Sequence, residues 1–220
     1  MLISDQYHQI QDSIKNKLLS IERNPSDIEL IAVSKKQPKE KIIELLNCGH
    51  RTFGENQIQE IESKWPSIKN DFPDVRIIFI GSIQSRKVKK ICELCDEVHS
   101  VDREKIVKLI SDIKSQGLKT PKLFLQVNVG LEKQKSGIPP NEINNFMNMS
   151  LLKYQITYEG LMCIPPERQD PKIYFDQLKS LSIANNLNKL SMGMSGDYLT
   201  ALESGSTHIR IGSSIFGARG

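Results

Sequence analysis

The sequence predicts an α/β fold made of a single (β/α)8 barrel of the TIM type, with an extra helix at the N-terminus. Short apolar runs alternate with longer amphipathic runs along the whole chain, as in proteins that alternate strands with helices. The alternation gives eight candidate strands, and this count favours a closed barrel over an open doubly wound sheet. The 220 residues are 38% hydrophobic and contain no linker or repeat, so we expect one domain over residues 1–220.

The first predicted element is a helix over residues 5–22, where Ile10, Ile14 and Leu18 are spaced by four. The chain after the eighth candidate strand is too short for a full helix. A barrel of this type needs a complete outer ring of helices. We therefore expect the N-terminal helix to cover the gap.

The remaining elements follow in strict alternation. The candidate strands are Ile28–Ser34, Arg51–Gly54, Val75–Gly81, Glu97–Val101, Lys122–Val129, Gln155–Met162, Lys189–Met192 and His208–Ile211. The candidate helices between them are Pro38–Asn47, Gln57–Lys64, Arg86–Cys92, a helix from the N-cap Asp102 to near Gly117, Asn141–Ser150, Asp170–Ala184 and Tyr198–Ser204. Pro38 is suited to a first helical turn, and Gly49 follows the end of the same helix.

The charge balance points away from nucleic acid as a partner. The chain has 30 basic and 26 acidic residues, a formal net charge of +4, and the two signs are interleaved. One basic stretch covers residues 86–90, but no aromatic side chain lies between its charges for base stacking. We interpret it as a solvated helix face and expect no nucleic-acid partner. The slight basic excess suits sites that bind anionic small molecules.

The sequence favours the cytoplasm. No apolar run approaches the ~20 residues that span a bilayer, and the first ten residues lack the order of a signal peptide. We therefore expect no membrane partner. The four cysteines lie at no disulfide-framework spacing: Cys48, Cys92, Cys95 and Cys163. Cys92 and Cys95 form a CxxC without a second pair or nearby histidines, so we favour a chance pair on a helix over a zinc site.

The ends of strands seven and eight carry glycine and serine. Strand seven leads into residues 191–195 (SMGMS), and strand eight leads into residues 210–214 (RIGSS). Glycine allows backbone N–H groups to approach phosphate oxygens, and a short helix beginning near Ser213 would add its positive end. Either motif alone is typical of a tight turn. Both together, on the strands that usually carry phosphate in this fold, favour a phosphate site.

Lysine follows strand one directly, in the sequence Ser34-Lys35-Lys36. A desolvated lysine has a lowered pKa and can attack an aldehyde, although a lone lysine after a strand is more often solvated. Here the lysine faces the expected phosphate site across the barrel mouth. Pyridoxal phosphate offers both an aldehyde and a phosphate. Strand parity does not choose between Lys35 and Lys36, because parallel strands are buried on both faces.

Seven motifs in order resemble those of the pyridoxal phosphate homeostasis proteins, which are relatives of the N-terminal barrel of alanine racemase. They are AVSKKQP (32–38), FGENQIQE (53–60), FIGSIQSRK (79–87), QVNVGLEKQKSGI (126–138), GLMCIP (160–165), LSMGMSGD (190–197) and RIGSSIFGAR (210–219). The resemblance covers nearly the whole chain. It implies a fold-type III barrel that binds pyridoxal 5'-phosphate, with the Schiff-base lysine at Lys35.

The resemblance also implies the other cofactor contacts. Asn56 matches a residue beside the cofactor, and Met192 and Ser195 match cofactor contacts, with Ser195 on the phosphate. Gly212 and Ser213 match the family's other phosphate contacts, and Arg210 matches the residue that faces the pyridine nitrogen. Because arginine accepts no proton, it keeps that nitrogen unprotonated and weakens the ring as an electron sink.

The chain departs from the family pattern at three positions. Ile78 and Arg86 stand where members usually have His and Asn, and Cys163 replaces a common alanine. The first two departures bear on the rim of the site or on partner contacts. Neither of these two touches the residues inferred to bind the cofactor, and the change at Cys163 is a small one.

Two classes of function compete: a protein that stores or delivers pyridoxal phosphate, and an amino-acid racemase. A racemase needs an acid/base on each face of the cofactor. In alanine racemase a tyrosine from the second domain of a partner subunit provides one, and we find neither such a domain nor a tyrosine at a strand end. We therefore expect a monomeric binding protein without a clear catalysed reaction, active in vitamin B6 homeostasis. Apo-enzymes that need the cofactor are candidate recipients.

Overall fold

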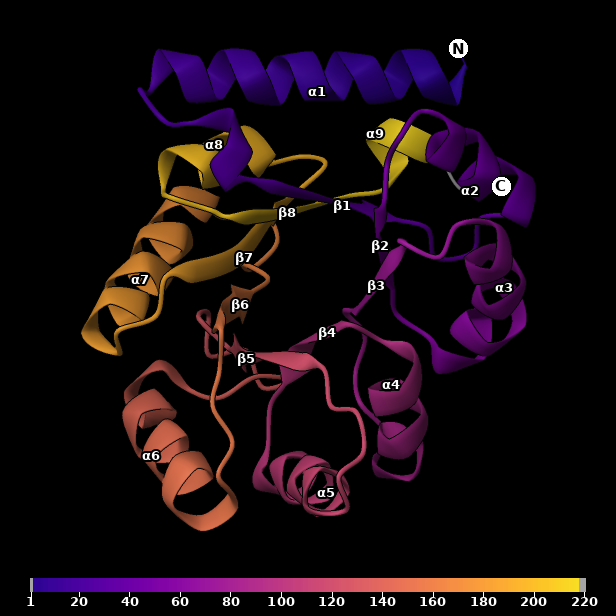
Figure 1. Cartoon of the computed structure of the whole chain (residues 1–220). Coiled ribbons are helices and arrows are strands. Elements are labelled where there is room, and N and C mark those ends of the chain that lie inside the picture. The colour runs from indigo at the N-terminus through magenta and orange to yellow at the C-terminus, as the bar shows by residue number, and fades with distance from the viewer. Residues whose placement is uncertain (1, 218–220) are drawn as a thin grey trace.

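The eight predicted strands form one closed parallel barrel, in the order β1 to β8, in a computed structural model that describes residues 2–217 (Figure 1). The strands are β1 (Glu29–Val33), β2 (Thr52–Glu55), β3 (Arg76–Phe79), β4 (Glu97–Val101), β5 (Lys122–Val127), β6 (Gly160–Cys163), β7 (Lys189–Met194) and β8 (His208–Ile211). The barrel closes where β1 pairs with β8, with Leu30 opposite Ile209. The predicted fold class is therefore confirmed.

Helices surround the barrel in the predicted alternation. They are α1 (Ile3–Ser20), α2 (Lys39–Asn47), α3 (Ile58–Asp71), α4 (Val88–Leu94), α5 (Glu104–Ser115), α6 (Ile143–Tyr154), α7 (Pro171–Ala184), α8 (Tyr198–Glu203) and α9 (Ser213–Phe216). Single 3-10 turns cover Pro25–Asp27, Ser85–Lys87 and Pro140–Glu142. The short α9 begins at Ser213, where the sequence places it.

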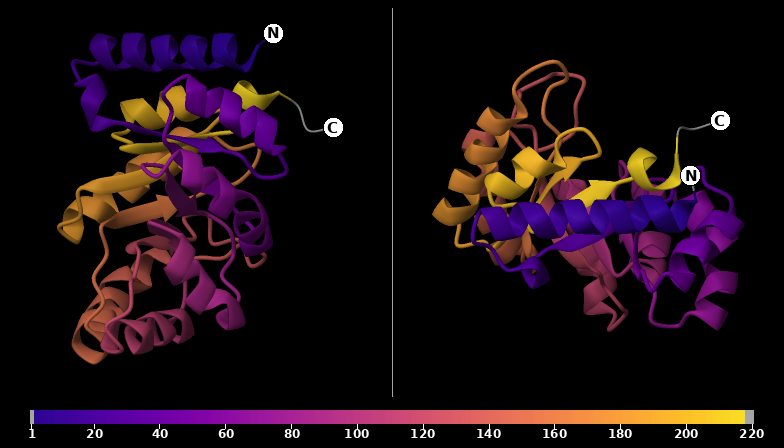
Figure 2. Two further views of the ribbon diagram at one scale, coloured as in Figure 1. Left: turned by 45° about the vertical axis from the view of Figure 1, so that its right-hand side comes forward. Right: turned by 90° about the horizontal axis from the view of Figure 1, so that it is seen from above.

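Helix α1 covers the gap in the outer ring, as expected. It lies across the outside of the barrel and packs against α2, α8 and α9 (Figure 2). Tyr7, Ile14 and Leu18 lie on its buried face, and burying a side chain as large as leucine contributes roughly 1.5–3 kcal/mol. Although α1 is 18 residues long, neither it nor any other helix within residues 2–217 is long and apolar enough to cross a membrane.

The core has two layers separated by the strands. Outside the barrel, Phe53 of β2 packs against Trp65 of α3, with ring centroids 5.0 Å apart. Within the barrel, Phe124 of β5 packs against His99 of β4, with centroids 3.9 Å apart. The outer layer is mostly apolar, with a few buried polar side chains such as Lys64 and Ser150, whereas the interior mixes apolar and hydrogen-bonding side chains.

Two predicted helix boundaries are wrong. Helix α3 continues past Lys64 and Pro66 to Asp71, because the fully buried Trp65 and its apolar neighbours outweigh the hydrogen bond that proline removes. Asp102 is not the N-cap of α5. Its carboxylate binds the guanidinium of Arg103, and Arg103 itself is the extended residue before the helix.

Two further boundaries shift for local reasons. Gln155, predicted to begin strand six, instead ends α6 in a left-handed conformation with a φ of 54°, so β6 begins only at Gly160. Pro38 lies before the first turn of α2, as its extended N-cap residue.

Candidate functional site

A cavity of about 460 Å³ lies at the carboxyl ends of the strands. Its lining comes from β1, β2, β3, β5, β6, β7 and β8 or the loops that follow them. Six of the seven sequence-predicted site residues line it: Lys35, Asn56, Ser195, Arg210, Gly212 and Ser213. The fold therefore brings together residues from the two ends of the chain at the end of the barrel where such proteins carry their chemistry.

The two adjacent lysines after β1 have different surroundings. Lys35 is partly buried and lines the cavity, whereas Lys36 is exposed and does not. Lys36 has a left-handed backbone with a φ of 58°, and its N–H donates to Glu60 Oε2 at 2.7 Å. This geometry favours Lys35 over Lys36 as the residue that meets a ligand in the cavity.

Buried charges hold the backbone before Lys35. Ser34 Oγ donates to Glu55 Oε1 at 2.8 Å, and the Lys64 ammonium donates to the Ser34 carbonyl at 3.2 Å. Lys64 also lies 2.9 Å from Glu55 and 2.8 Å from Glu60. Burial raises the pKa of Glu55, and the charge of Lys64 opposes that rise. Together with the Glu60 bond, these contacts fix the main chain on both sides of Lys35.

The predicted phosphate-binding segments lie at one side of the cavity. Ser195 follows β7, and the loop that contains it is held by Asp197, whose Oδ1 accepts from the Met194 N–H at 2.6 Å. Gly212 precedes α9, and a Cβ at Gly212 would lie 3.2 Å from the Val33 carbonyl oxygen. Hydroxyl groups and the amino-terminal end of a helix thus meet at this edge. Residues 218 and 219 of the last sequence motif lie outside the described residues.

Arg210 projects from β8 with its guanidinium bound on two sides. Nη1 donates to Ser191 Oγ at 2.7 Å, and Nη2 donates to the Cys163 carbonyl at 2.9 Å. The residue is 4% exposed, and burial lowers the pKa of its guanidinium. Because arginine only donates hydrogen bonds, it offers a donor to any acceptor in the cavity.

Asn56 carries a polar atom that lacks a partner. Its Oδ1 is buried and accepts no hydrogen bond within the described residues, a situation that costs about 1–3 kcal/mol. The backbone of Asn56 is packed against Gly81, where an added Cβ would lie 2.0 Å from the Asn56 carbonyl oxygen. The amide of Asn56 carries both an acceptor and a donor, so it suits the ring oxygen of pyridoxal phosphate, which donates as a hydroxyl and accepts as a phenolate.

One predicted site residue does not line the cavity, and several residues that do line it were not predicted. Met192 is fully buried and is not among the lining residues, so its cofactor contact stays a prediction. Met194, two residues later, does line the cavity, as do Gln126 and Ile164. Gln126 could have been found as a polar residue near the end of the otherwise apolar run of β5.

Two of the three departures from the family pattern lie away from the cavity, whereas the carbonyl of the third, Cys163, accepts a hydrogen bond from Arg210. Ile78 is fully buried in β3. Arg86 is exposed, and its Nε donates to Gln84 Oε1 at 3.2 Å. Neither residue lines the cavity, in agreement with the expectation that they leave the inferred cofactor contacts intact.

The CxxC pair is buried. Burial raises the pKa of the Cys92 thiol to about 11 and that of Cys95 to about 12. Cys163, beside the cavity wall, also has its pKa raised to about 12 by burial. Thiols of this kind are poor nucleophiles and poor metal ligands, in line with the chance-pair interpretation.

Comparisons with known proteins agree on one family. The model of the alanine racemase N-terminal domain matches residues 11–220. The pyridoxal phosphate homeostasis protein of Vibrio alginolyticus is 38% identical over 207 residues, which cover 90% of this chain and 89% of that protein. Its namesake from Escherichia coli is 32% identical over 220 residues, covering 96% and 94%.

Solved structures show the same barrel. PipY of Synechococcus elongatus, solved with PLP bound, has a TM-score of 0.80 and 33% identity, covering 93% of this chain and 100% of that chain. Alanine racemase from Corynebacterium glutamicum shares the fold at 14% identity, with a TM-score of 0.70 over 99% of this chain and 60% of that chain. The chain therefore belongs to the alanine racemase N-terminal domain family and, within it, to the family of the pyridoxal phosphate homeostasis proteins.

Proposed function

We propose that this protein binds pyridoxal 5'-phosphate as a Schiff base on Lys35 and acts in cytoplasmic homeostasis of this vitamin B6 cofactor. The single observation that carries the proposal is one cavity lined by Lys35, Asn56 and Arg210 together with the glycine and serine residues after β7 and β8. The names of the relatives from Vibrio and Escherichia coli, and the PLP bound to PipY, support the same ligand.

Each lining residue has a task that suits its chemistry. Ser195, Gly212 and Ser213 would hold the phosphate through hydroxyl and backbone donors. The side-chain amide of Asn56 would bind the ring oxygen, with Nδ2 as the donor, because that oxygen is a phenolate beside a protonated Schiff base. Arg210 would donate to the ring nitrogen and keep it unprotonated. When bound, the cofactor supplies a reactive aldehyde and a conjugated ring.

A binding protein fits the cavity better than a racemase. Racemisation needs an acid/base on each face of the substrate. Among the described residues that line the cavity, the titratable side chains are Lys35 and Arg210, and arginine does not release its proton in proteins. None of the lining residues is a tyrosine. These observations support handling of the cofactor over turnover of an amino acid.

The test uses the neighbouring lysine as its control. Purified protein reconstituted with pyridoxal phosphate should show the absorbance band of a protonated Schiff base, and borohydride should fix the cofactor to the peptide that contains Lys35. Lys35→Ala should abolish the band, whereas Lys36→Ala, in the exposed neighbour, should retain it. Absence of the band in the reconstituted protein, or loss of it in Lys36→Ala alone, would refute the assignment.

The racemase alternative has its own test. Incubation of the holoprotein with L-alanine and other L-amino acids should give no D-isomer above the rate of free pyridoxal phosphate. Robust conversion that depends on Lys35 would favour the enzyme.

The proposed partners follow from the same role. The protein is proposed to be a monomer that transfers its cofactor to apo-enzymes, without nucleic-acid or membrane partners. Mixing the holoprotein with an apo-enzyme that needs the cofactor should restore that enzyme's activity, and gel filtration should give a mass close to 25.0 kDa.

A further inference from the structure

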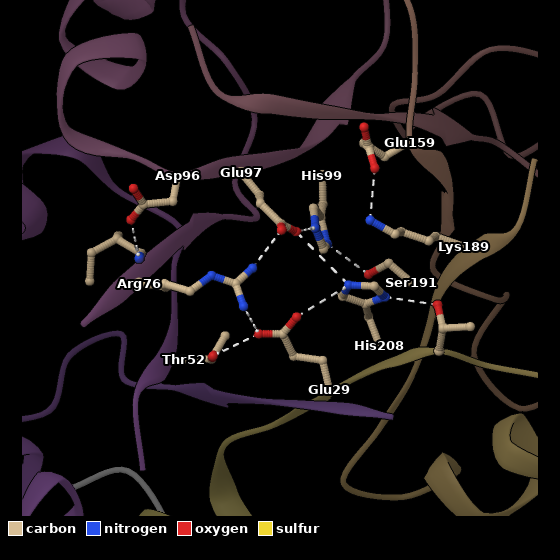
Figure 3. Close-up of polar contacts among 12 residues, drawn as sticks. Glu29, Thr52, Arg76, Asp96, Glu97, His99, Glu159, Lys189, Ser191 and His208 are labelled. Atoms are coloured by element: carbon tan, nitrogen blue, oxygen red, sulfur yellow. Dashed lines mark hydrogen bonds and ion pairs between the residues drawn. The ribbon is translucent and has the colours of Figure 1, made fainter. Parts of the chain in front are cut away.

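The opposite end of the barrel is lined by the first residues of its strands. Polar or charged side chains begin seven strands: Glu29, Thr52, Arg76, Glu97, Lys122, Lys189 and His208. They border a second cavity of about 570 Å³. Arg76 spans it, with ion pairs to Glu29 and to Glu97, the latter at 2.6 Å (Figure 3). A partly buried ionic network therefore lies at the opposite end of the barrel from Lys35.

One branch of this network crosses the barrel interior toward the cofactor cavity. Glu97 Oε2 lies 3.0 Å from His99 Nε2, and His99 Nδ1 lies 2.9 Å from Ser191 Oγ (Figure 3). Ser191 Oγ in turn accepts from Arg210 Nη1 at 2.7 Å. Glu97, His99, Ser191 and Arg210 are each at most 4% exposed. A continuous chain of buried hydrogen bonds therefore links Glu97 to the arginine that lines the cofactor cavity.

The direction of each bond follows from the arginine. Arg210 only donates, so the Ser191 oxygen accepts from it and its own proton is available to His99 Nδ1. His99 then carries its proton on Nε2 and donates to Glu97. Burial lowers the pKa of His99 to about 4, which keeps the imidazole neutral, and its two hydrogen-bond partners select this tautomer. Every donor in the branch thus finds an acceptor, the condition for a buried network that fixes geometry.

We propose that Ser191, His99 and Glu97 are positioning residues that hold the Arg210 guanidinium in the orientation from which it faces the ring nitrogen of the cofactor. This inference rests on the proposed function, since it assigns a role toward the same ligand. Without the Ser191 hydroxyl, the guanidinium keeps the Cys163 carbonyl and loses the bond that stops its rotation. The ring nitrogen would then meet a misplaced donor.

The experiment compares pairs of variants at two positions. Ser191→Ala and His99→Leu break the chain, whereas Ser191→Thr keeps the hydroxyl and His99→Asn keeps an acceptor for it. Ser150→Ala is the matched control, because Ser150 is equally buried on α6 and also has two partners, the Phe146 carbonyl at 2.8 Å and the Tyr158 hydroxyl at 3.0 Å. Each variant is reconstituted with pyridoxal phosphate, and its absorbance spectrum, the pH midpoint of its band and the Kd of the cofactor are measured.

Ser191→Ala and His99→Leu should weaken cofactor binding about five- to tenfold, the effect of losing one hydrogen bond at a fixed donor. They should also shift the band and its pH midpoint. Ser191→Thr and His99→Asn should stay within about twofold of the wild type. Ser150→Ala should leave the Kd of the cofactor and the absorbance spectrum unchanged. This should hold even if Ser150→Ala lowers the melting temperature as much as Ser191→Ala does.

Three outcomes separate the possibilities. If the wild type shows no band, the proposed function fails before the variants are considered. If the wild type binds but folded Ser191→Ala and His99→Leu match it in spectrum and Kd, the positioning role is wrong. If Ser150→Ala shifts the spectrum equally, the effect is one of general stability and the inference is also wrong. Circular dichroism confirms folding, and should Ser191→Ala not fold, the His99→Leu and His99→Asn pair decides.

Discussion

The ammonium of Lys64 lies 2.9 Å from the carboxylate of Glu55, and both groups bind Ser34, the residue directly before Lys35. The pair is buried, with 10% of the Lys64 side chain and none of the Glu55 side chain exposed. Two adjacent strands and α3 are therefore tied together by charge immediately beside the lysine that lines the cofactor cavity.

Lys64→Met should destabilise the protein by about 3 kcal/mol, because it leaves the Glu55 carboxylate buried without a cation. The remaining donors to Glu55 are Ser34 and the indole N–H of Trp65, both neutral. Urea unfolding monitored by circular dichroism measures the loss. Adding Glu55→Gln should recover more than half of it, since the uncompensated charge is then gone.

The control for this prediction is Lys87→Met. Lys87 lies 3.9 Å from Glu62 and is more exposed, so its removal should change stability by less than about 0.5 kcal/mol. A loss in Lys64→Met no larger than in Lys87→Met would show that the buried pair contributes little.

The lowered pKa of Glu29 predicts that the folded protein loses stability as the pH falls below 4.5. Burial alone would raise this pKa, but contacts with His208, Thr52 and Arg76 outweigh that effect. The pKa of the Glu29 carboxyl is therefore lowered from 4.5 to about 2. The unfolded chain therefore takes up a proton first as pH falls. The contribution of the carboxylate is complete above pH 4.5 and disappears between that pH and about 2.

Glu29→Gln should cost up to about 3 kcal/mol at pH 6 and much less at pH 2.5, when urea unfolding of the variant and the wild type is compared across this range. Glu159→Gln removes a more exposed carboxylate paired with Lys189, and its cost should be within about 0.5 kcal/mol at both pH values. A pH-independent cost for Glu29→Gln would contradict the assignment.

The lowered pKa of His50 predicts a second pH dependence of similar size at higher pH. Burial lowers its pKa to about 4 from an ordinary 6.5, and its Nε2 lies 2.6 Å from the Thr52 carbonyl. Between pH 6.5 and 4 the imidazole of His50 is protonated in the unfolded chain and neutral in the folded chain. The stability that neutral His50 contributes is therefore complete above pH 6.5 and is lost as the pH falls toward 4.

His50→Gln should flatten the decline in stability over this interval, whose slope from one histidine approaches about 1.4 kcal/mol per pH unit. Thermal unfolding at half-unit steps of pH measures it. His8→Gln, at an exposed position on α1, should follow the wild-type curve. The assignment of His50 fails if both variants give the same pH profile.

Gly81→Ala should impair cofactor binding through the backbone of Asn56. The added Cβ would lie 2.0 Å from the Asn56 carbonyl oxygen, so the main chain at one of the two residues must move. We expect a loss of about 2 kcal/mol in stability and cofactor binding weakened by about tenfold, measured by urea unfolding and by titration with pyridoxal phosphate. Gly196→Ala, also at the cavity but facing open space, should leave stability unchanged; an equal loss there would rule out the clash.

Apolar runs were sufficient to predict the barrel. The observed bounds of β4 and β8 equal the predicted ones, because charged or turn residues flank both runs. A long apolar run does not show where its strand begins. Ile156 and Tyr158 are as buried as strand residues, yet they lie before β6. Their burial comes from packing onto neighbouring helices and strands, which a single sequence does not specify.

The candidate site was predicted in two different ways. Residue type at the strand ends was enough to predict Ser195, Gly212 and Ser213. Local spacing did not distinguish Lys35 from Lys36, and only the family motif separated these two lysines. The branch through Glu97, His99 and Ser191 escaped prediction because its members come from β4 and β7. Contacts across a barrel depend on strand tilt and stagger, and no periodicity along the chain records them.

The pairing of β1 with β8 joins the first strand of the barrel to be synthesised to the last. Lys35 follows the first strand to leave the ribosome, whereas Arg210 lies in the last strand and Gly212 and Ser213 follow it. A nascent chain lacks the phosphate-binding edge until almost all of it has emerged. A ligand that binds only the closed ring stabilises it over open intermediates by mass action. The supply of cofactor would then govern how completely newly made chains mature, as well as how full the finished ones are.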